Sequence, residues 1–435
     1  MHTLDDLRRG RLAGATRLDL SCGLTQFPDE IFELADSLEV LNLSGNALSS
    51  LPHDLGRLHR LKVLFCSHNR FTEVPASVGQ CLRLEMVGLR NNRITHLPAA
   101  ALGPNLRALV LTENCLEQLP DALGDCQQLQ KLMLAGNRLR ALPASLARCQ
   151  RLELLRVSAN RLSELPQWLL TMPRLAWLAY AGNPLPQGLA APQAPGRCDA
   201  IDWHALELGE VLGQGASGVI HRVQVAGRKA ALKLYKGQMT SDGSPLNEMQ
   251  ACVAAGAHPN LIPLLGQVAN HPHQVPGLLM ALVGTHLSAL AGPPSLQTCT
   301  RDVYPPGLCL GLQAATRLAT AIASVAAHLH QRGITHGDLY AHNILCDAQG
   351  NAVLGDFGAA SFFAQDGSAA ADALQRIEVR AFGVLLGELL ACCGEASEEL
   401  ADLQASCVQP QVLARPDFAQ VERVLRRQGR LLQEA

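Results

Sequence analysis

The chain has 435 residues, enough for two or three domains with buried cores. Hydrophobic residues make up 48% of it, charged residues 17%, and the formal net charge is −2. This balance offers no overall electrostatic attraction to nucleic acid or to an anionic membrane, so we expect neither as a partner.

The N-terminal residues, MHTLDDLRRGRLAG, include Asp5 and Asp6 and lack the apolar core of a secretory signal. No apolar run is long enough to span a bilayer. The fourteen cysteines form no paired CxxC clusters, and Cys81, Cys126 and Cys149 recur at one position of a repeat. We therefore expect buried free thiols in a reducing cytoplasm, while delivery into another cell as a secreted effector stays open.

Internal repeats dominate residues 15–186. LEVLNLSGNALSSLPHDLGRLHR, from Leu38, returns as LKVLFCSHNRFTEVPASVGQCLR and recurs onward. An asparagine recurs every 23 residues, with one gap of 22: Asn46, Asn69, Asn92, Asn114, Asn137, Asn160 and Asn183. The pattern resembles the leucine-rich repeat family in its LPxxL variant, which also occurs in secreted bacterial effectors. The resemblance implies about eight units stacked as an α/β solenoid, a horseshoe, over residues 1–186.

The function of such an array lies in the positions that its repeat leaves free. Strand residues between the inward leucines would face the concave side of the solenoid. Four of them are large and apolar where water would otherwise lie: Phe65, Met86, Met133 and Trp177. We predict that they form a surface for a protein partner, and the alternative is ordinary scatter of exposed apolar side chains.

Residues 187–203 are rich in Pro, Ala and Gly and aperiodic, which indicates a linker. After them, Gly213, Gly215 and Gly218 form GxGxxG, and Ile220 follows at the position usually held by Val. The apolar pattern has period 2 on both sides of these glycines. It therefore predicts a strand–turn–strand rather than the strand–turn–helix of a dinucleotide fold.

Further motifs follow in order. Lys233 lies in Ala-Leu-Lys on the third predicted strand, and Glu248 opens a helical pattern, NEMQACVAA. The loop ITHGDLYAHNIL contains Asp338 and Asn343, and VLGDFG contains Asp356. This order resembles the protein-kinase family, and together with the repeats it resembles a bacterial-type leucine-rich repeat protein kinase. The resemblance implies an α+β two-lobed domain over residues 204–435.

The resemblance also implies the roles of these side chains. Glu248 would pair with Lys233 and hold it on the α- and β-phosphates of ATP, under the backbone amides of the glycine loop. Asp338 would accept or orient the acceptor hydroxyl. Asn343 and Asp356 would hold Mg²⁺, which prefers hard oxygen ligands.

Two other segments extend the resemblance. The strand LLMALV would lead into a hinge, where backbone groups near Ala281 and Val283 would bind adenine. In the loop, His336 is expected to brace the backbone, and His342 has no assigned role beyond structure. ATP and Mg²⁺ are thus the expected cofactors.

The chain also departs from the protein-kinase pattern. Gly337 stands where an Arg usually meets a phosphorylated loop, and Tyr340 stands where a Lys is common. Only 19 residues separate Gly358 from Glu378, which resembles the acidic start of the central helix. They hold no APE-like triplet, so the usual partner of Arg415 is missing. Activation by loop phosphorylation is therefore not expected.

These features favour an ATP-dependent protein kinase of the serine/threonine type, whose repeats recruit a protein partner or substrate. Two alternatives stay open. HGD is also the form found in kinase-like enzymes that phosphorylate small molecules, and the segment that is short here is where protein kinases seat the polypeptide substrate, so a small-molecule kinase is the second hypothesis. A nucleotide-binding pseudokinase scaffold is the third hypothesis, which the presence of Lys233, Asp338 and Asp356 argues against. The oligomeric state is not predicted.

Overall fold

The computed structural model describes residues 2–186, 188–189, 198–215, 217–236, 239–240 and 242–434. Its contacts divide the chain into two compact units, Met1–Met172 and Pro173–Ala435. The strand of the last predicted repeat therefore belongs to the second unit. Most of the predicted linker, at 187 and 190–197, lies outside the described residues.

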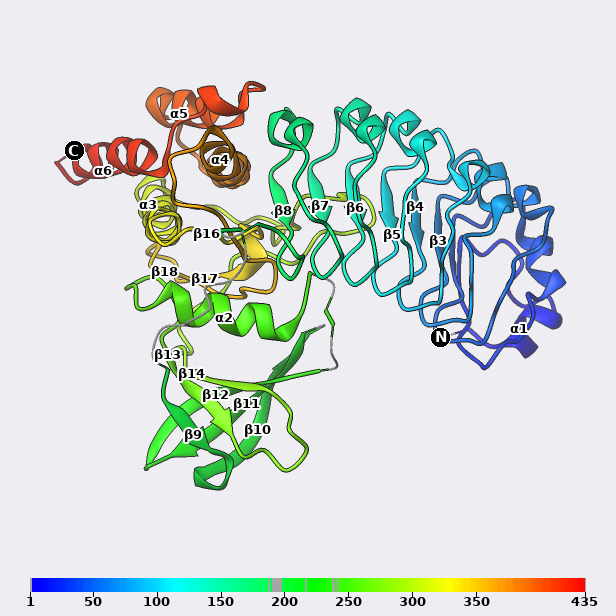
Figure 1. Cartoon of the computed structure of the whole chain (residues 1–435), viewed down its shortest axis with the longest axis horizontal. Helices are drawn as coiled ribbons and strands as arrows, with labels where there is room; N and C mark the ends of the chain where they lie inside the picture. The colour runs from blue at the N-terminus through cyan, green and yellow to red at the C-terminus, as the bar shows by residue number, and fades with distance from the viewer. Residues whose placement is uncertain are drawn as a thin grey trace. The chain divides into compact units, whose positions relative to one another are not determined.

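The first unit is a series of parallel strands, one per repeat (Figure 1). Each strand pairs in register with the next, as in Val40 with Val63 and Leu41 with Leu64. The central leucines point inward and are fully buried, as the LxxLxL pattern requires. The elements are α1 (Leu4–Arg8), β1 (Arg17–Asp19), β2 (Val40–Asn42), β3 (Val63–Phe65), β4 (Met86–Gly88), β5 (Ala108–Val110), β6 (Lys131–Met133) and β7 (Leu154–Arg156).

The repeat asparagines bond the backbone where each unit turns. Asn114 is buried, and its side-chain amide donates to the carbonyl oxygens of Leu89 at 2.9 Å and Leu111 at 3.0 Å. Its side-chain oxygen accepts from the amide of Ile94 at 3.0 Å. One side chain therefore joins two successive units and satisfies backbone groups that would otherwise be buried without partners.

Short 3₁₀ helices form the return side of each unit. A proline stands directly before most of them, where its fixed φ suits the start of the turn. They are η1 (Asp29–Leu34), η2 (Leu55–Arg57), η3 (Ala76–Gln80), η4 (Ala99–Ala101), η5 (Asp121–Asp125), η6 (Ala144–Arg148) and η7 (Gln167–Thr171). Cys81, Cys126 and Cys149 are buried free thiols here, as predicted, and burial raises their pKa to about 11.

The predicted exposed apolar surface is wrong for three of its four residues. Met86, Met133 and Trp177 are only 6%, 8% and 1% exposed, and only Phe65 keeps partial exposure. For Met86 and Met133, in-register parallel strands place each side chain between neighbours in its row, which covers it laterally. The ring of Trp177 is covered instead by Tyr340, on which it stacks. The ring of Phe65 itself packs onto Gly88, where an added Cβ would lie 2.7 Å from its Cδ1.

The second unit contains two lobes. The smaller is a six-stranded sheet in the order β10-β11-β12-β14-β13-β9, with one helix, α2 (Pro245–Ala255). A cluster of buried side chains from β11, β12 and β14 forms its core. The strands are β9 (Ala200–Asp202), β10 (Leu206–Gln214), β11 (Gly218–Val225), β12 (Arg228–Tyr235), β13 (Leu264–Ala269) and β14 (Gly277–Ala281), and the 3₁₀ helix η8 (Trp203–Ala205) lies between β9 and β10.

The larger lobe is mainly helical (Figure 1). Its helices are α3 (Leu312–His330), α4 (Ala369–Ala391), α5 (Glu398–Val408) and α6 (Phe418–Glu434), with the short η9 (Ala341–Asn343) and η10 (Val412–Ala414). Small strands complete it: β8 (Trp177–Ala179), β15 (Ser288–Ala289), β16 (Ile334–Thr335), β17 (Ile344–Cys346), β18 (Ala352–Leu354) and β19 (Ser361–Phe362). In the described parts of the chain, none of the helices combines the length and apolarity that a membrane crossing needs.

One predicted helix boundary is wrong. Glu378 does not begin the central helix, because α4 starts at Ala369 and Glu378 is buried in its middle. Ser368 caps this start by accepting a hydrogen bond from the amide of Ala371. The segment between Gly358 and the helix is therefore even shorter than the sequence indicated.

Candidate functional site

Lys233 and Glu248 form the expected ion pair between strand β12 and helix α2. Lys233 Nζ lies 2.5 Å from Glu248 Oε1, and both residues are buried. Helix α2 places Glu248 in its first turn because Ser244 caps the helix and Pro245 starts it. Burial raises the pKa of Glu248, and the ammonium of Lys233 opposes that shift. Burial would lower the pKa of Lys233, but the neighbouring carboxylates raise it overall.

Asp356 lies beside this pair. Its Oδ1 is 3.6 Å from Lys233 Nζ and accepts a hydrogen bond from the amide of Gly358 at 3.2 Å. The backbone at Asp356 is left-handed, with φ 52°, and the next residue, Phe357, turns into the lobe and is buried. His336 contacts the ring of Phe357 and bonds the carbonyl oxygen of Gly355 at 3.0 Å, which is the bracing role predicted for it.

Asp338 and Asn343 are held together within the predicted catalytic loop, residues 334–345. The side-chain amide of Asn343 donates to Asp338 Oδ2 at 2.8 Å and to the carbonyl oxygen of Asp338 at 3.0 Å. The amide of Gly355 donates to the carbonyl oxygen of Asn343 at 3.0 Å, which ties the loop to the residue before Asp356. The four predicted catalytic side chains and Asp356 thus belong to one connected region.

The donors fit Mg²⁺ rather than a softer metal. Asn343 and Asp356 supply an amide and a carboxylate oxygen, and the carboxylate of Asp356 is 47% exposed. No group of three His, Cys, Asp or Glu side chains gathers anywhere among the described residues to form a cage. Mg²⁺ commonly binds through one or two protein oxygens plus substrate phosphates, so these two residues would hold it together with ATP.

A cavity of about 150 Å³ opens beside Lys233 and Asp356, with Ile220 and Met280 in its lining. Ligand sites usually measure about 300–1,000 Å³, so this cavity takes only part of a nucleotide. A larger hollow of about 960 Å³ contains none of the predicted site residues and is lined by side chains from α5, η10 and α6. The smaller cavity is the candidate nucleotide site, because Lys233, Glu248 and Asp356 line it.

The glycine loop connects β10 and β11 as a hairpin, with Gly213 opposite Ile220. Gly218 is required by packing, since an added Cβ would lie 2.5 Å from the carbonyl oxygen of Leu234. Gly213 and Gly215 have open space around them, so a ligand can approach their backbone closely. The strand–turn–strand prediction is confirmed.

The predicted hinge follows β14. Ala281 is the last residue of that strand, and its amide donates to the carbonyl oxygen of Pro263 at 2.8 Å. Adenine would therefore use other backbone groups of the segment that runs to Val283. The adenine-binding role of these two residues stays a prediction.

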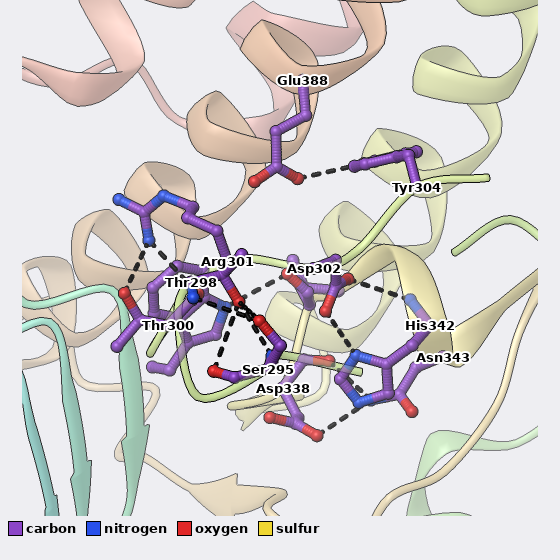
Figure 2. Close-up of polar contacts among 12 residues, drawn as sticks. Ser295, Thr298, Thr300, Arg301, Asp302, Tyr304, Asp338, His342, Asn343 and Glu388 are labelled. Carbon is purple, nitrogen blue, oxygen red and sulfur yellow. Dashed lines mark hydrogen bonds and ion pairs between the residues drawn. The ribbon is translucent and has the colours of Figure 1, made fainter. Parts of the chain in front are cut away.

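Sequence reasoning missed several side chains that hold the catalytic loop. Glu378 accepts a hydrogen bond from the amide of Gly337 at 2.6 Å, and its other oxygen lies 2.7 Å from His330 Nε2. Asp302 accepts from the backbone amide of His342 at 3.0 Å and bonds its ring Nδ1 at 2.8 Å (Figure 2). These partners lie 40 or more residues away in sequence, so no local motif marks them.

Two protein families match segments of the chain. The protein kinase domain family matches residues 206–380, and the leucine rich repeat family matches residues 14–71 and 83–139. The chain carries a protein kinase domain behind leucine-rich repeats. The kinase domain is similar to CBL-interacting protein kinase 22 of Oryza sativa subsp. japonica, with 30% identity over 36% of each chain.

The kinase domain is also similar to the serine/threonine-protein kinase mos of Xenopus laevis, with 30% identity over 37% of this chain and 43% of that protein. The chain thus spans less than half of the length of these relatives. A solved leucine-rich repeat protein of Leptospira interrogans aligns with a TM-score of 0.38 and 27% identity, covering 42% of this chain and 54% of that one.

Proposed function

We propose that the chain is an ATP- and Mg²⁺-dependent protein kinase of the serine/threonine type. One observation carries the proposal: the buried Lys233–Glu248 pair has Asp356 beside it and lines the same cavity. A scaffold that only bound partners would have no need for this buried, mutually dependent set of charges.

Each side chain has a defined task in this proposal. Lys233, fixed by Glu248, would bind the phosphates of ATP, and Asn343 and Asp356 would hold Mg²⁺, whose charge would offset that of the phosphates. Asp338 accepts the hydrogen bond of the acceptor hydroxyl and takes its proton. The acceptor oxygen forms a bond to the γ-phosphorus while the bond to the β-phosphate oxygen breaks, which releases ADP. The hydrogen bond from Asn343 keeps the Asp338 carboxylate oriented for this task.

The protein class of the acceptor rests on the relatives, whose names identify them as protein kinases, including a serine/threonine kinase. We further propose that the repeats recruit a protein partner, since a solenoid offers a long surface and Phe65 keeps an exposed edge. All fourteen cysteines are free thiols, which fits a reducing cytoplasm.

A small-molecule kinase is the second candidate, favoured by the short segment between Gly358 and α4. Fewer residues there leave less backbone to seat an extended peptide. The same phosphate chemistry would then serve a smaller acceptor, and the repeats would have another task.

The test is transfer of label from γ-labelled MgATP by the purified full chain, alone and with a protein extract. Asp338→Asn should abolish labelling, while the exposed repeat variant Asp121→Asn should label like the wild type. Labelled protein that is lost only in Asp338→Asn supports the proposal. Turnover of ATP that requires an added metabolite pool supports the small-molecule kinase, and ATP binding without any turnover contradicts both.

A further inference from the structure

We propose that residues 173–180, the end of the repeat array, act as positioning residues for Asp338 and replace a phosphorylated activation segment. The proposal rests on the kinase function above. It begins from the observation that these residues belong to the same compact unit as the catalytic loop. They contact each of the positions at which the sequence departs from the protein-kinase pattern.

The first contact is on Tyr340, two residues after Asp338. The rings of Trp177 and Tyr340 stack with centroids 4.3 Å apart and planes 8° apart. Trp177 Nε1 also donates to the carbonyl oxygen of Leu339 at 3.2 Å. Trp177 is 1% and Tyr340 4% exposed, so this stack is part of a packed core. Tyr340 therefore faces β8 and is not placed like a lysine that reaches toward phosphate.

The second contact explains Gly337, directly before Asp338. Its φ is +71°, and an added Cβ would lie 2.9 Å from the carbonyl oxygen of Leu178 and 2.5 Å from that of Ala359. The carbonyl oxygens of Ala359 and of Leu178 in β8 thus both lie too close for any side chain, and the positive φ also favours glycine. An arginine that could meet a phosphate is excluded here by the backbone on both sides, one side being the short segment and the other β8.

The third contact is on the short segment after Gly358. The amide of Tyr180 donates to Ser361 Oγ at 3.0 Å, and the Tyr180 hydroxyl donates to the carbonyl oxygen of Phe362 at 2.9 Å. Ser361 is fully buried, so its hydroxyl is not accessible to a modifying enzyme. Strand β19, which contains both residues, pairs with β16 just ahead of the catalytic loop.

The fourth contact supplies a partner for Arg415. Its guanidinium donates to the carbonyl oxygens of Pro173 at 2.8 Å, Gln409 at 2.9 Å and Arg376 at 3.1 Å. Arg415 is 2% exposed, so these backbone oxygens replace an acidic partner. Arg380 adds a bond to the carbonyl oxygen of Arg174 at 3.1 Å.

Together these contacts fix the residues that flank Asp338 in the sequence: Gly337 before it, and Leu339 and Tyr340 after it. The space left between β8, the catalytic loop and α4 is about 10 Å³, no more than one water needs. A loop packed this closely needs no phosphate to order it. Phosphoryl transfer depends mainly on positioning, so a loosened loop should lower the rate by about 10²-fold.

The experiment compares Trp177→Ala with Trp168→Ala in the full chain. Trp168 lies in η7 of the preceding repeat and takes part in none of the four contacts described above, so it serves as the matched control. Trp177→Ala should lower kcat for labelling of self or of casein by about 10²-fold, with the KM for ATP changed less than about threefold. Trp177→Phe, which keeps a ring but loses the Nε1 donor, should recover most of the rate.

Amide hydrogen exchange gives a readout beyond activity. Trp177→Ala should speed exchange in residues 336–343, while peptides of β10 to β12 keep the wild-type rate. Phosphatase treatment of the wild type should change neither that exchange nor kcat. If Trp177→Ala fails to fold, Trp177→Phe and the phosphatase comparison still decide the question.

Three outcomes would overturn the inference: an unchanged kcat in Trp177→Ala, a higher kcat, which would make β8 a block, or a wild type that loses activity after phosphatase treatment. A wild type that binds ATP without transferring phosphate would instead contradict the proposed function. In that case, slower amide hydrogen exchange of residues 336–343 in the wild type than in Trp177→Ala would still support the positioning contact.

Discussion

At the scale of single residues, the buried Lys233–Glu248 pair is the most consequential contact. Both side chains are almost fully removed from water, at 10% and 3% exposed. Each charge is tolerated there because the other compensates it. Removing one partner leaves the second charge buried and unpaired. If the pair binds ATP as proposed, activity and stability are therefore coupled at it.

Lys233→Met should abolish phosphate transfer and lower the free energy of unfolding by about 3–5 kcal/mol, because Glu248 loses its compensating charge. Lys233→Met combined with Glu248→Leu should recover most of that stability without recovering transfer. Denaturant unfolding of the single and double variants measures both effects.

The repeat pair Lys62–Glu39 is the control. Its atoms are 3.0 Å apart, but its side chains are 40% and 38% exposed. Lys62→Met should change stability by less than about 1 kcal/mol, since solvent screens such a pair. Equal losses at Lys62 and Lys233 would contradict the role of burial.

His342 should make stability depend on pH. Burial would lower its pKa, but the hydrogen bond to Asp302 and the charges of Asp338, Asp302 and Asp356 raise it above its ordinary value of 6.5. A raised pKa in the folded state means that the extra stability is fully present below about pH 6.5 and is lost as the pH rises through the folded-state pKa.

Asp302→Asn should therefore destabilise the chain by about 1–3 kcal/mol at pH 6 and by clearly less at pH 9, measured by denaturant unfolding. Asp36→Asn is the control, since the Asp36 side chain is fully exposed, 3.6 Å from His59. A gap between wild type and Asp302→Asn that stays constant from pH 6 to pH 9 would refute the titration of His342.

At the scale of elements, the repeat asparagines make each unit depend on its neighbour. Asn114 bonds carbonyl oxygens in its own turn and in the preceding unit, and it is 6% exposed. Its loss would leave several backbone groups buried without partners. In a solenoid, such a defect lies at an interface between units and weakens cooperation between them.

Asn114→Ala should lower the free energy of unfolding of the compact unit Met1–Met172 by about 2–4 kcal/mol, because buried donors and acceptors lose their partner. Asn105→Ala, on an exposed loop of the same unit, should cost less than about 1 kcal/mol even though Asn105 bonds the carbonyl oxygen of Leu82. Thermal unfolding of both variants tests the difference, and equal losses would count against the buried network.

The residues proposed to be catalytic could be found in the sequence because their signals are local. Lys233, Asp338 and Asp356 each sit in a short motif whose spacing reflects one strand or loop. The contact of Trp177 with Tyr340 spans 163 residues, and only the fold brings the two rings together. The predicted exposed apolar surface failed for three residues because a strand pattern shows which side of the strand a side chain faces. It does not show which other side chains cover that side.

At the scale of the whole molecule, the compact units do not follow the repeat pattern. The predicted repeat domain ended at residue 186, but the contacts divide the chain after Met172. Residues 173–186 contribute Trp177 and Tyr180 to the packing of the larger lobe. We therefore expect folding of that lobe to require them.

A chain of residues 173–435 should be more stable than one of residues 198–435 by at least about 3 kcal/mol, because the shorter chain loses a buried Trp and a buried Tyr. Both keep β9 and the whole smaller lobe. Denaturant unfolding of the two chains is the measurement. Equal midpoints would show that residues 173–197 add nothing to the lobe.

The position of β8 also limits which recombination events in evolution can replace the repeat array. A strand that serves both the last repeat and the catalytic lobe cannot be exchanged with a foreign array without breaking the lobe. Recombination that gives the proposed kinase a new recognition array should keep activity only where the junction lies before Pro173. Chimaeras joined at the end of the repeat motif, after residue 186, should be inactive.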